Sequence, residues 1–223
     1  MIVRRSMHPG WLSNAYLVYD RPGGCAVFVD SGAPLDPLLE EIERERLTVT
    51  HLLLTHGHAD HVAGNGELAS RFGLEPRRED AASGQLRIEA LPTPGHSQDG
   101  VSFVVDGACF SGDTLFRDAV GGARDAFDDV RRSVMDVLMA LPPETVAYPG
   151  HTDETTIGRE WERNPFVRAW RGLDPEGTEP CRVGGADATL VVWSPDYDGK
   201  GKAWVRFRDG RNAIVGGSRV ERA

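Results

Sequence analysis

Short apolar segments alternate with segments of helical periodicity along most of the chain. The strand candidates are rich in Val, Ile, Leu, Phe and Tyr, and most are bounded by Gly, Pro or Asp. They cover Ala15–Tyr19, Cys25–Asp30, Val49–Leu54, Leu86–Leu91, Val101–Val105, Ala108–Ser111 and Thr145–Tyr148. Their apolar runs do not alternate strictly, which is typical of strands covered on both faces. The pattern therefore predicts sheets that lie between helices.

The segments between these strands show helical spacing. Apolar residues recur at i, i+3, i+4 and i+7 from Leu35 to Ile42, so we predict a helix over Pro34–Arg46. Similar spacing predicts helices over Asn65–Phe72 and Asp128–Leu141. The first part of the chain thus belongs to the α/β class.

The pattern changes near Gly172, after which only strand signals remain. These strands are predicted over Ala188–Trp193, Ala203–Arg208 and Asn212–Val215, with Asp- and Gly-rich turns between them. We therefore predict a domain boundary, with residues 1–172 forming the main domain and residues 173–223 a small β-rich C-terminal domain.

Aromatic residues in the C-terminal segment bear on its role. Trp193, Tyr197 and Trp204 are expected to pack a small barrel-like unit against the main domain. An interaction surface or a lid over the metal cleft is the alternative.

Composition narrows the choice of partners and location. The chain of 223 residues has 34 acidic and 25 basic residues, a net charge of −9 and no dense Lys/Arg block, so we predict neither a nucleic-acid nor a membrane partner. Nowhere do about 18 apolar residues run together, and the N-terminus lacks the apolar core of an export signal. The three cysteines are widely separated, which fits a reducing compartment, so a cytoplasmic location is predicted.

One segment concentrates groups that bind metals. T-H-G-H-A-D-H (55–61) directly follows the strand Val49–Leu54 in a chain with only seven histidines. Side chains two residues apart in an extended segment point to the same side, so His56 and His58 can converge on one ion while Asp60 and His61 turn toward a second. Imidazole and carboxylate ligands suit Zn²⁺, Mn²⁺ or Fe²⁺.

Further ligand-type side chains follow later strands in Gly-containing turns. His96 lies in P-T-P-G-H, Asp113 in S-G-D-T and His151 in Y-P-G-H, each just after a predicted strand. An α/β sandwich gathers its site at strand ends. Five of the seven histidines now occupy such turns, so two adjacent metals with six to seven ligands are predicted.

These motifs carry a family resemblance. T-H-G-H-A-D-H (55–61), T-P-G-H (93–96), F-S-G-D-T-L-F (110–116) and Y-P-G-H (148–151) together resemble the ordered signature of the metallo-β-lactamase-fold superfamily. An aspartate at position 113 resembles the hydroxyacylglutathione hydrolase (glyoxalase II) branch, as do N-A-Y-L-V (14–18) and T-I-G-R-E (156–160). The resemblance implies an α/β fold, the αββα four-layer sandwich of the metallo-β-lactamase type, here with a small β-rich C-terminal extension.

The same resemblance implies a role for each ligand. Metal one would be held by His56, His58 and His96, and metal two by Asp60, His61 and His151. Asp113 would bridge the two divalent ions, with Zn²⁺ expected first and Fe or Mn as alternatives. A hydroxide formed from a water shared by the ions would attack the carbonyl of a small-molecule hydroxyacyl thioester. Asp60 and Asp113 are then the catalytic residues, and Asp60 could orient the hydroxide.

Two further residues are expected to support the ligands. Asp30 and Thr55 lie at strand ends near the motif, where ligating histidines usually need a partner on the other ring nitrogen. A turn-forming role for Asp30 and a plain strand position for Thr55 are the alternatives.

Several functional alternatives remain open. A mononuclear non-haem iron persulfide dioxygenase would use the same motif residues, whereas a lactone or β-lactam hydrolase and a non-catalytic binding module are less favoured.

Glyoxalase II enzymes usually follow G-D-T-L-F with C-G-(K/R), but R-D-A-V-G-G-A-R-D-A-F (117–127) places Gly122 at the basic position, with Arg124 as the near replacement. The thiol carrier is therefore undetermined, and a homodimer is compatible with the sequence. The short, polar segment 73–85 predicts a trimmed flank and an open site.

Overall fold

The computed structural model describes residues 1–222 and begins with a five-stranded sheet. Its order is β1 (Ile2–Met7), β2 (Asn14–Tyr19), β3 (Cys25–Val29), β4 (Thr48–Leu53) and β5 (Pro76–Arg77). The strands pair antiparallel from β1 to β3 and parallel from β3 to β5. Two helices cover one face, α1 (Asp36–Glu45) and α3 (Asn65–Phe72), and their apolar faces share a core with this sheet.

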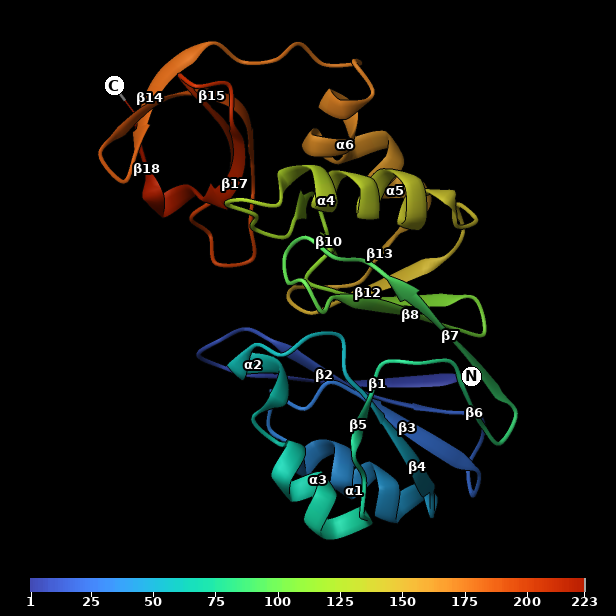
Figure 1. Cartoon of the computed structure of the whole chain (residues 1–223). Coiled ribbons are helices and arrows are strands. Elements are labelled where there is room, and N and C mark those ends of the chain that lie inside the picture. Colours follow the sequence, from blue (N-terminus) through green and yellow to red (C-terminus); the bar gives the residue numbers. More distant parts are fainter. Residues whose placement is uncertain (223) are drawn as a thin grey trace.

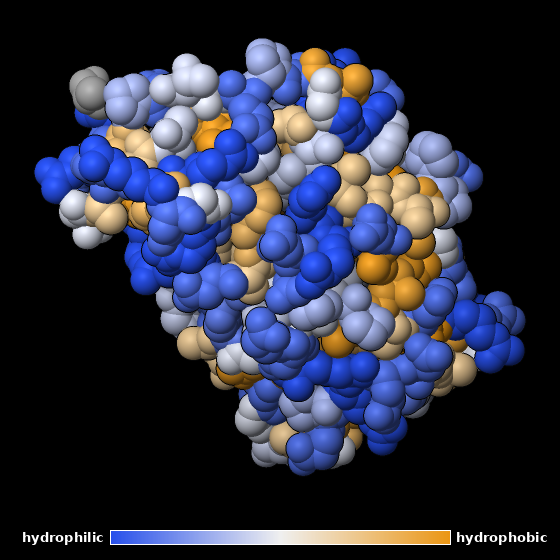
Figure 2. All heavy atoms as spheres, turned by 45° about the horizontal axis from the view of Figure 1, so that its top comes forward, coloured by the Kyte–Doolittle hydropathy of each residue, from blue (hydrophilic) through white to orange (hydrophobic). Residues whose placement is uncertain are grey.

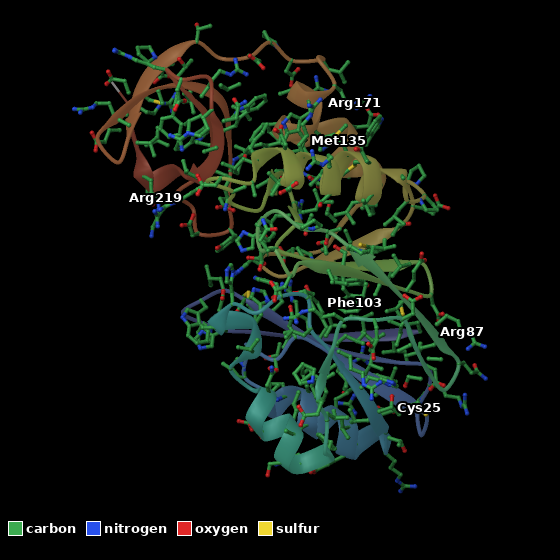
Figure 3. All side chains as sticks on the ribbon, in the orientation of Figure 1. Cys25, Arg87, Phe103, Met135, Arg171 and Arg219 are labelled. Atoms are coloured by element: carbon green, nitrogen blue, oxygen red, sulfur yellow. The ribbon has the colours of Figure 1, made fainter. Side chains whose placement is uncertain are left out.

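A second sheet faces the first. Its six strands run in the order β13 (Thr155–Thr156), β12 (Val146–Pro149), β9 (Ala108–Gly112), β8 (Val101–Val105), β7 (Leu86–Pro92) and β6 (Ala81–Ser83). Only the β12/β9 pair is parallel. The core between the two sheets includes Phe103, Phe110 and Val27, and Figure 3 shows Phe103 in this central layer.

Strand β2 explains why the apolar runs do not alternate. Leu17 and Tyr19 belong to the core under α1 and α3, whereas Tyr16 and Val18 belong to the core between the sheets. Both faces of the strand are buried, so every position is apolar or hydrogen-bonded.

A second helical layer covers the outer face of the second sheet. It consists of α4 (Phe127–Arg132), the π-helical turn η1 (Ser133–Val137), the 3₁₀ turn η2 (Leu138–Ala140), α5 (Ile157–Arg163) and α6 (Pro165–Trp170). Val130, Val134 and Leu138 pack there against Cys109 and Ala147 of the sheet. Figure 1 shows the resulting order of layers, and the predicted αββα sandwich is confirmed. The helix predicted over Asp128–Leu141 is found as one uninterrupted helical segment that changes from α to π at Ser133 and to 3₁₀ at Leu138.

The C-terminal part is a separate antiparallel sheet. Its order is β17 (Asn212–Gly216), β16 (Lys202–Phe207), β15 (Ala186–Ser194), β14 (Glu179–Val183) and β18 (Val220–Arg222), with the 3₁₀ turn η3 (Gly217–Arg219) before β18. Figure 1 shows this β-rich region curled beside the helical layer. It has a small core of its own around Leu190 and Val205, yet Val191, Trp204 and Ile214 belong to the core of the helical layer.

Segment 73–85 lies at the edges of the two sheets. Segment 73–85 contributes only the short edge strands β5 and β6 and no helix, as its length and polarity predicted.

None of the helices in residues 1–222 is long and apolar enough to cross a membrane. The face in Figure 2 is largely hydrophilic, with apolar atoms gathered mainly over the helical layer, where Met135, Met139 and Trp161 are only partly buried.

Candidate metal centre

All seven predicted ligands meet at one edge of the sandwich, where strands of both sheets end. The turn after β4 carries His56 and His58, and the short helix α2 (Ala59–Val62) carries Asp60 and His61. The remaining side chains come from the other sheet and lie after β7, after β9 and after β12: His96, Asp113 and His151. Residues that are up to about a hundred positions apart in the chain thus form one site.

The first cluster consists of three histidines. His56 Nε2 and His96 Nε2 each lie 3.0 Å from His58 Nδ1. His56 is buried, whereas His58 is exposed, so this cluster opens to solvent on the His58 side. Three ring nitrogens that converge on one point form a set of ligands for a cation.

The second cluster combines a carboxylate with two histidines. His151 Nε2 lies 3.4 Å and His61 Nε2 3.8 Å from Asp60 Oδ2. Both histidines are buried, and Asp60 is partly exposed.

Asp113 lies between the two clusters. Its Oδ1 is 3.3 Å from His61 Nε2, and its Oδ2 is 3.4 Å from both His96 Nε2 and His151 Nε2. Position 150 in the adjacent turn must be glycine, because a Cβ there would collide with the Asp113 carboxylate. Asp113 thus contacts ring nitrogens of both clusters, and the bridging role that the family resemblance implies for it stays a prediction.

Unpaired buried atoms show that the centre fits cations. Within residues 1–222, His61 Nε2, Asp113 Oδ1 and His151 Nδ1 are buried without a hydrogen-bond partner. An unsatisfied buried polar atom typically costs about 1–3 kcal/mol. The first two face each other across 3.3 Å at the middle of the ligand set. Imidazole nitrogens and carboxylate oxygens are ligands of Zn²⁺ and Fe²⁺, so these residues fit metal ions.

Electrostatics in the centre favour the neutral form of His56 and the protonated forms of His61 and His151. Burial lowers the pKa of His56 to about 4. Burial would also lower the pKa of His61, but the charges of Asp113 and Asp30 outweigh it and raise the value to about 11. Burial would raise the pKa of Asp113, but the positive charges of His61 and His151 hold it well below its usual range. These protons balance the carboxylate charge, and metal binding would displace them.

Asp30 and Thr55, the two residues expected to support the ligands, lie next to His61 and His56. Asp30 Oδ2 accepts a hydrogen bond of 2.8 Å from His61 Nδ1 and one of 2.7 Å from Thr55 Oγ1. Its Oδ1 accepts from the backbone N–H of Thr55, and Thr55 Oγ1 lies 3.1 Å from His56 Nδ1. Such contacts orient the rings so that Nε2 faces the centre.

One contributor was missed by the sequence analysis, and a second was expected only under the alternative of a lid. The backbone carbonyl of Gly122 accepts from His96 Nδ1 at 3.0 Å, a contact that side-chain patterns do not signal. Tyr197, in the turn between β15 and β16, stacks on His151 with ring centroids 4.0 Å apart and planes 7° apart.

The structure separates the roles of the three C-terminal aromatic residues. Trp204 packs in the core of the helical layer, as expected. Trp193 is 38% exposed and does not, so that part of the prediction was wrong. Tyr197 instead stacks on His151 of the metal centre, and a lid role for this segment stays a prediction.

Comparisons with known proteins agree with this geometry. The family model described as "Metallo-beta-lactamase superfamily" matches residues 8–84. Hydroxyacylglutathione hydrolase of Rhizobium meliloti is 34% identical over 210 residues, covering 69% of this chain and 81% of that protein. The chain belongs to the metallo-beta-lactamase superfamily.

Two solved structures are similar as well. ETHE1 from Myxococcus xanthus is 29% identical with a TM-score of 0.66, covering 76% of this chain and 85% of that one. TTHA1623, solved in a di-iron-bound form, is 30% identical with a TM-score of 0.59, covering 72% of this chain and 98% of that one. In this superfamily member, the His and Asp clusters are therefore able to hold metal ions.

Proposed function

We propose that this chain is a dinuclear metal-dependent hydrolase of a hydroxyacyl thioester, similar to hydroxyacylglutathione hydrolase. The observation that carries the proposal is the Asp113 carboxylate, whose two oxygens face nitrogens of both ligand clusters. The identity of 34% with a hydroxyacylglutathione hydrolase supports the same reading.

Each ligand has a place in the proposal. The first cluster and the second cluster would each hold one ion, and Asp113 would contact both. When bound, the two divalent cations supply activation of a water molecule and polarisation of the thioester carbonyl. We propose Zn²⁺, with Fe or Mn as alternatives; the di-iron form of TTHA1623 supports the iron option.

The protein's own groups prepare this chemistry. Asp30 accepts from His61 Nδ1, Thr55 lies against His56 Nδ1, and the Gly122 carbonyl accepts from His96 Nδ1, so the opposite nitrogens face the centre. Asp60 is the partly exposed carboxylate of the set and can orient the attacking water. A thiolate is a good leaving group, and the site therefore needs no strong general acid.

We also propose the type of substrate, the location and the partners of this enzyme. A small-molecule thioester in the cytoplasm is the substrate we expect, without a nucleic-acid or membrane partner, and a homodimer is compatible with it. We also propose that residues 1–172 form the catalytic domain and residues 173–223 a C-terminal domain.

A persulfide dioxygenase is the second candidate. The likeness to ETHE1, at 29% identity, favours it. The second cluster of Asp60, His61 and His151 does not separate the two candidates, because the dioxygenase would keep the same motif residues. The higher identity of 34% with a hydroxyacylglutathione hydrolase favours the hydrolase.

Metal analysis combined with two activity assays separates the candidates. We expect two metal ions per chain, hydrolysis of S-lactoylglutathione or another hydroxyacyl thioester, and no oxygen uptake with a persulfide. Asp113→Asn should lose most bound metal and activity. Asp106→Asn is the matched control, since Asp106 is exposed on the same sheet and asparagine tolerates its positive φ. One iron per chain with oxygen uptake would overturn the hydrolase proposal.

A further inference from the structure

Four histidines turn Nε2 toward the metal centre, and three of them have a partner on the other ring nitrogen. The three are His56, His61 and His96. The fourth, His151, differs, because within residues 1–222 its Nδ1 is buried without a hydrogen-bond partner. Ligating histidines almost always donate this N–H to a protein group or a water, which fixes the orientation of the ring. A group near His151 is therefore expected to supply the missing contact.

The rings around His151 do not supply this contact. Tyr197 stacks on the imidazole with planes 7° apart, so its hydroxyl lies outside the imidazole plane, in which the Nδ1–H bond points. Phe116 approaches edge-on at 5.8 Å and has no acceptor atom. His61 lies 5.5 Å away between ring centroids, and both of its nitrogens face carboxylates. These rings hold the faces of the imidazole, and the partner of Nδ1 must come from elsewhere.

The start of β2 is clamped to the turn that carries His151. Asn14 donates its backbone N–H to the Gly150 carbonyl at 2.7 Å and its Nδ2 to the Thr152 carbonyl at 2.9 Å. These two bonds lie on either side of His151 along the chain. They fix His151 opposite Ser13, its partner in an antiparallel bridge.

Ser13 brings a second unpaired group to the same place. Because the Asn14–Gly150 hydrogen bond flanks the bridge, Ser13 and His151 form a pair without mutual backbone hydrogen bonds. Side chains of such a pair lie on one side of the sheet, with Cβ atoms about 4.5–5.5 Å apart. Ser13 is 0% exposed, and within residues 1–222 its Oγ is also buried without a hydrogen-bond partner. Rotation about one side-chain bond redirects this hydroxyl without any change in the backbone.

We propose that Ser13 is the positioning residue of His151, and that its hydroxyl accepts a hydrogen bond from Nδ1–H when the second cluster holds a metal ion. The imidazole Nε2 is then fixed toward the ion, as in the other three histidines. Ser13 thus joins Thr55, Asp30 and the Gly122 carbonyl as the fourth support of a ligand ring. The inference rests on the second metal site of the proposed function.

Ser13→Ala removes the acceptor and leaves every ligand in place. We expect the metal affinity of the second cluster to fall about 10–100-fold, the usual effect of losing such a contact, while the first cluster keeps its affinity. Dialysis against a chelator should therefore leave the variant with one ion per chain under conditions in which the wild type keeps two. Ser83→Ala is the matched control, because Ser83 is an equally buried serine whose hydroxyl contacts Thr50 and no ligand.

Histidine NMR reads the contact itself. In zinc-loaded protein labelled with ¹⁵N-histidine, the Nδ1–H proton of His151 should exchange slowly with water. It should exchange faster in Ser13→Ala, whereas the Nδ1–H proton of His61, which Asp30 accepts, should be unaffected. An unchanged His151 proton in Ser13→Ala would overturn the inference, and so would equal metal loss in Ser13→Ala and Ser83→Ala.

The same experiments separate this inference from the proposed function. If the wild type binds two ions but hydrolyses no thioester, the proposed function fails, and the metal and NMR results still decide the role of Ser13. If a thioester is hydrolysed but Ser13→Ala keeps its second ion and its His151 signal, the Ser13 inference fails alone. If the wild type binds a single ion, the dinuclear proposal fails, and the NMR comparison of His151 decides on Ser13.

Discussion

At the residue scale, single carboxylates outside the ligand set hold the architecture in place. Asp30 is buried, has a positive φ of 56° and accepts three hydrogen bonds that tie β3 to the metal motif. Glu41 on α1 is buried as well and joins Tyr19 on β2 with Arg4 on β1. Both are polar residues in apolar surroundings, which explains why they carry such dense hydrogen bonding.

Asp30→Asn should weaken metal binding without unfolding the protein. Asparagine tolerates the positive φ, but its amide cannot replace both accepting oxygens toward His61 and Thr55. Loss of such a supporting contact typically costs about 10–100-fold in metal affinity. Competition with a chelator measures this change, and Asp20→Asn serves as a carboxylate control remote from the centre. Unchanged affinity would remove Asp30 from the positioning role.

Glu41→Gln should destabilise the fold in a pH-dependent way. Burial would raise the pKa of Glu41, but the hydrogen bond from Tyr19 and the charges of Arg4 and Arg44 outweigh it and lower the value. A lowered folded-state pKa adds stability above the unfolded value of 4.5, and that stability is lost as the pH falls below it.

We therefore expect Glu41→Gln to lose about 1–3 kcal/mol of unfolding free energy at pH 7. The difference from the wild type should shrink as the pH falls through 4 and below. Urea unfolding at several pH values measures both. A difference that does not depend on pH would contradict the ionised role of Glu41.

At the element scale, strands and helices with a clear apolar pattern were predicted, whereas elements with a weak pattern were not. Strand β8 and helix α3 have the predicted bounds. Strand β1 was missed because its positions are mostly exposed or half-buried and include Arg4 and Arg5, as befits an edge strand. The turn between β15 and β16 offered only an Asp- and Gly-rich pattern, yet it places Tyr197 on His151.

The stacked Tyr197 ring should stabilise the second cluster. Stacking of this kind is worth about 0.5–1.5 kcal/mol, or roughly 2- to 12-fold in affinity. Tyr197→Phe keeps the ring and should retain metal affinity, whereas Tyr197→Ala should release one metal ion more readily. Metal content after dialysis against a chelator measures this. Lys200→Ala, an exposed position of the same turn, is the control, and equal metal loss in both alanine variants would exclude the stacking effect.

At the scale of the whole molecule, the β-rich region is packed into the main sandwich. Val191, Trp204 and Ile214 lie in one core with Val130 and Phe127 of the helical layer. Backbone hydrogen bonds between Ala123 and Ile214 add a second connection. The region therefore supports the fold as well as the site.

Deletion of residues 173–223 should expose this core and lower thermal stability. Trp204→Ala in the full chain is the milder test, because a buried aromatic replaced by alanine typically costs about 3–5 kcal/mol. Thermal unfolding should show a lower Tm for both variants. The number of metal ions bound per chain should fall as the structure is lost. An unchanged Tm after deletion would show that the sandwich folds without the β-rich region.

The sequence by itself determined the sandwich and the candidate ligands. Buried strands need apolar residues on both faces, and a metal centre needs ligand-type side chains in strand-end turns, so both leave local patterns. Only the tertiary structure decided which groups surround that centre. The Gly122 carbonyl and the Tyr197 ring reach it through the packing of distant segments. Such contacts depend on how whole elements sit against one another, and no short pattern in the chain records that.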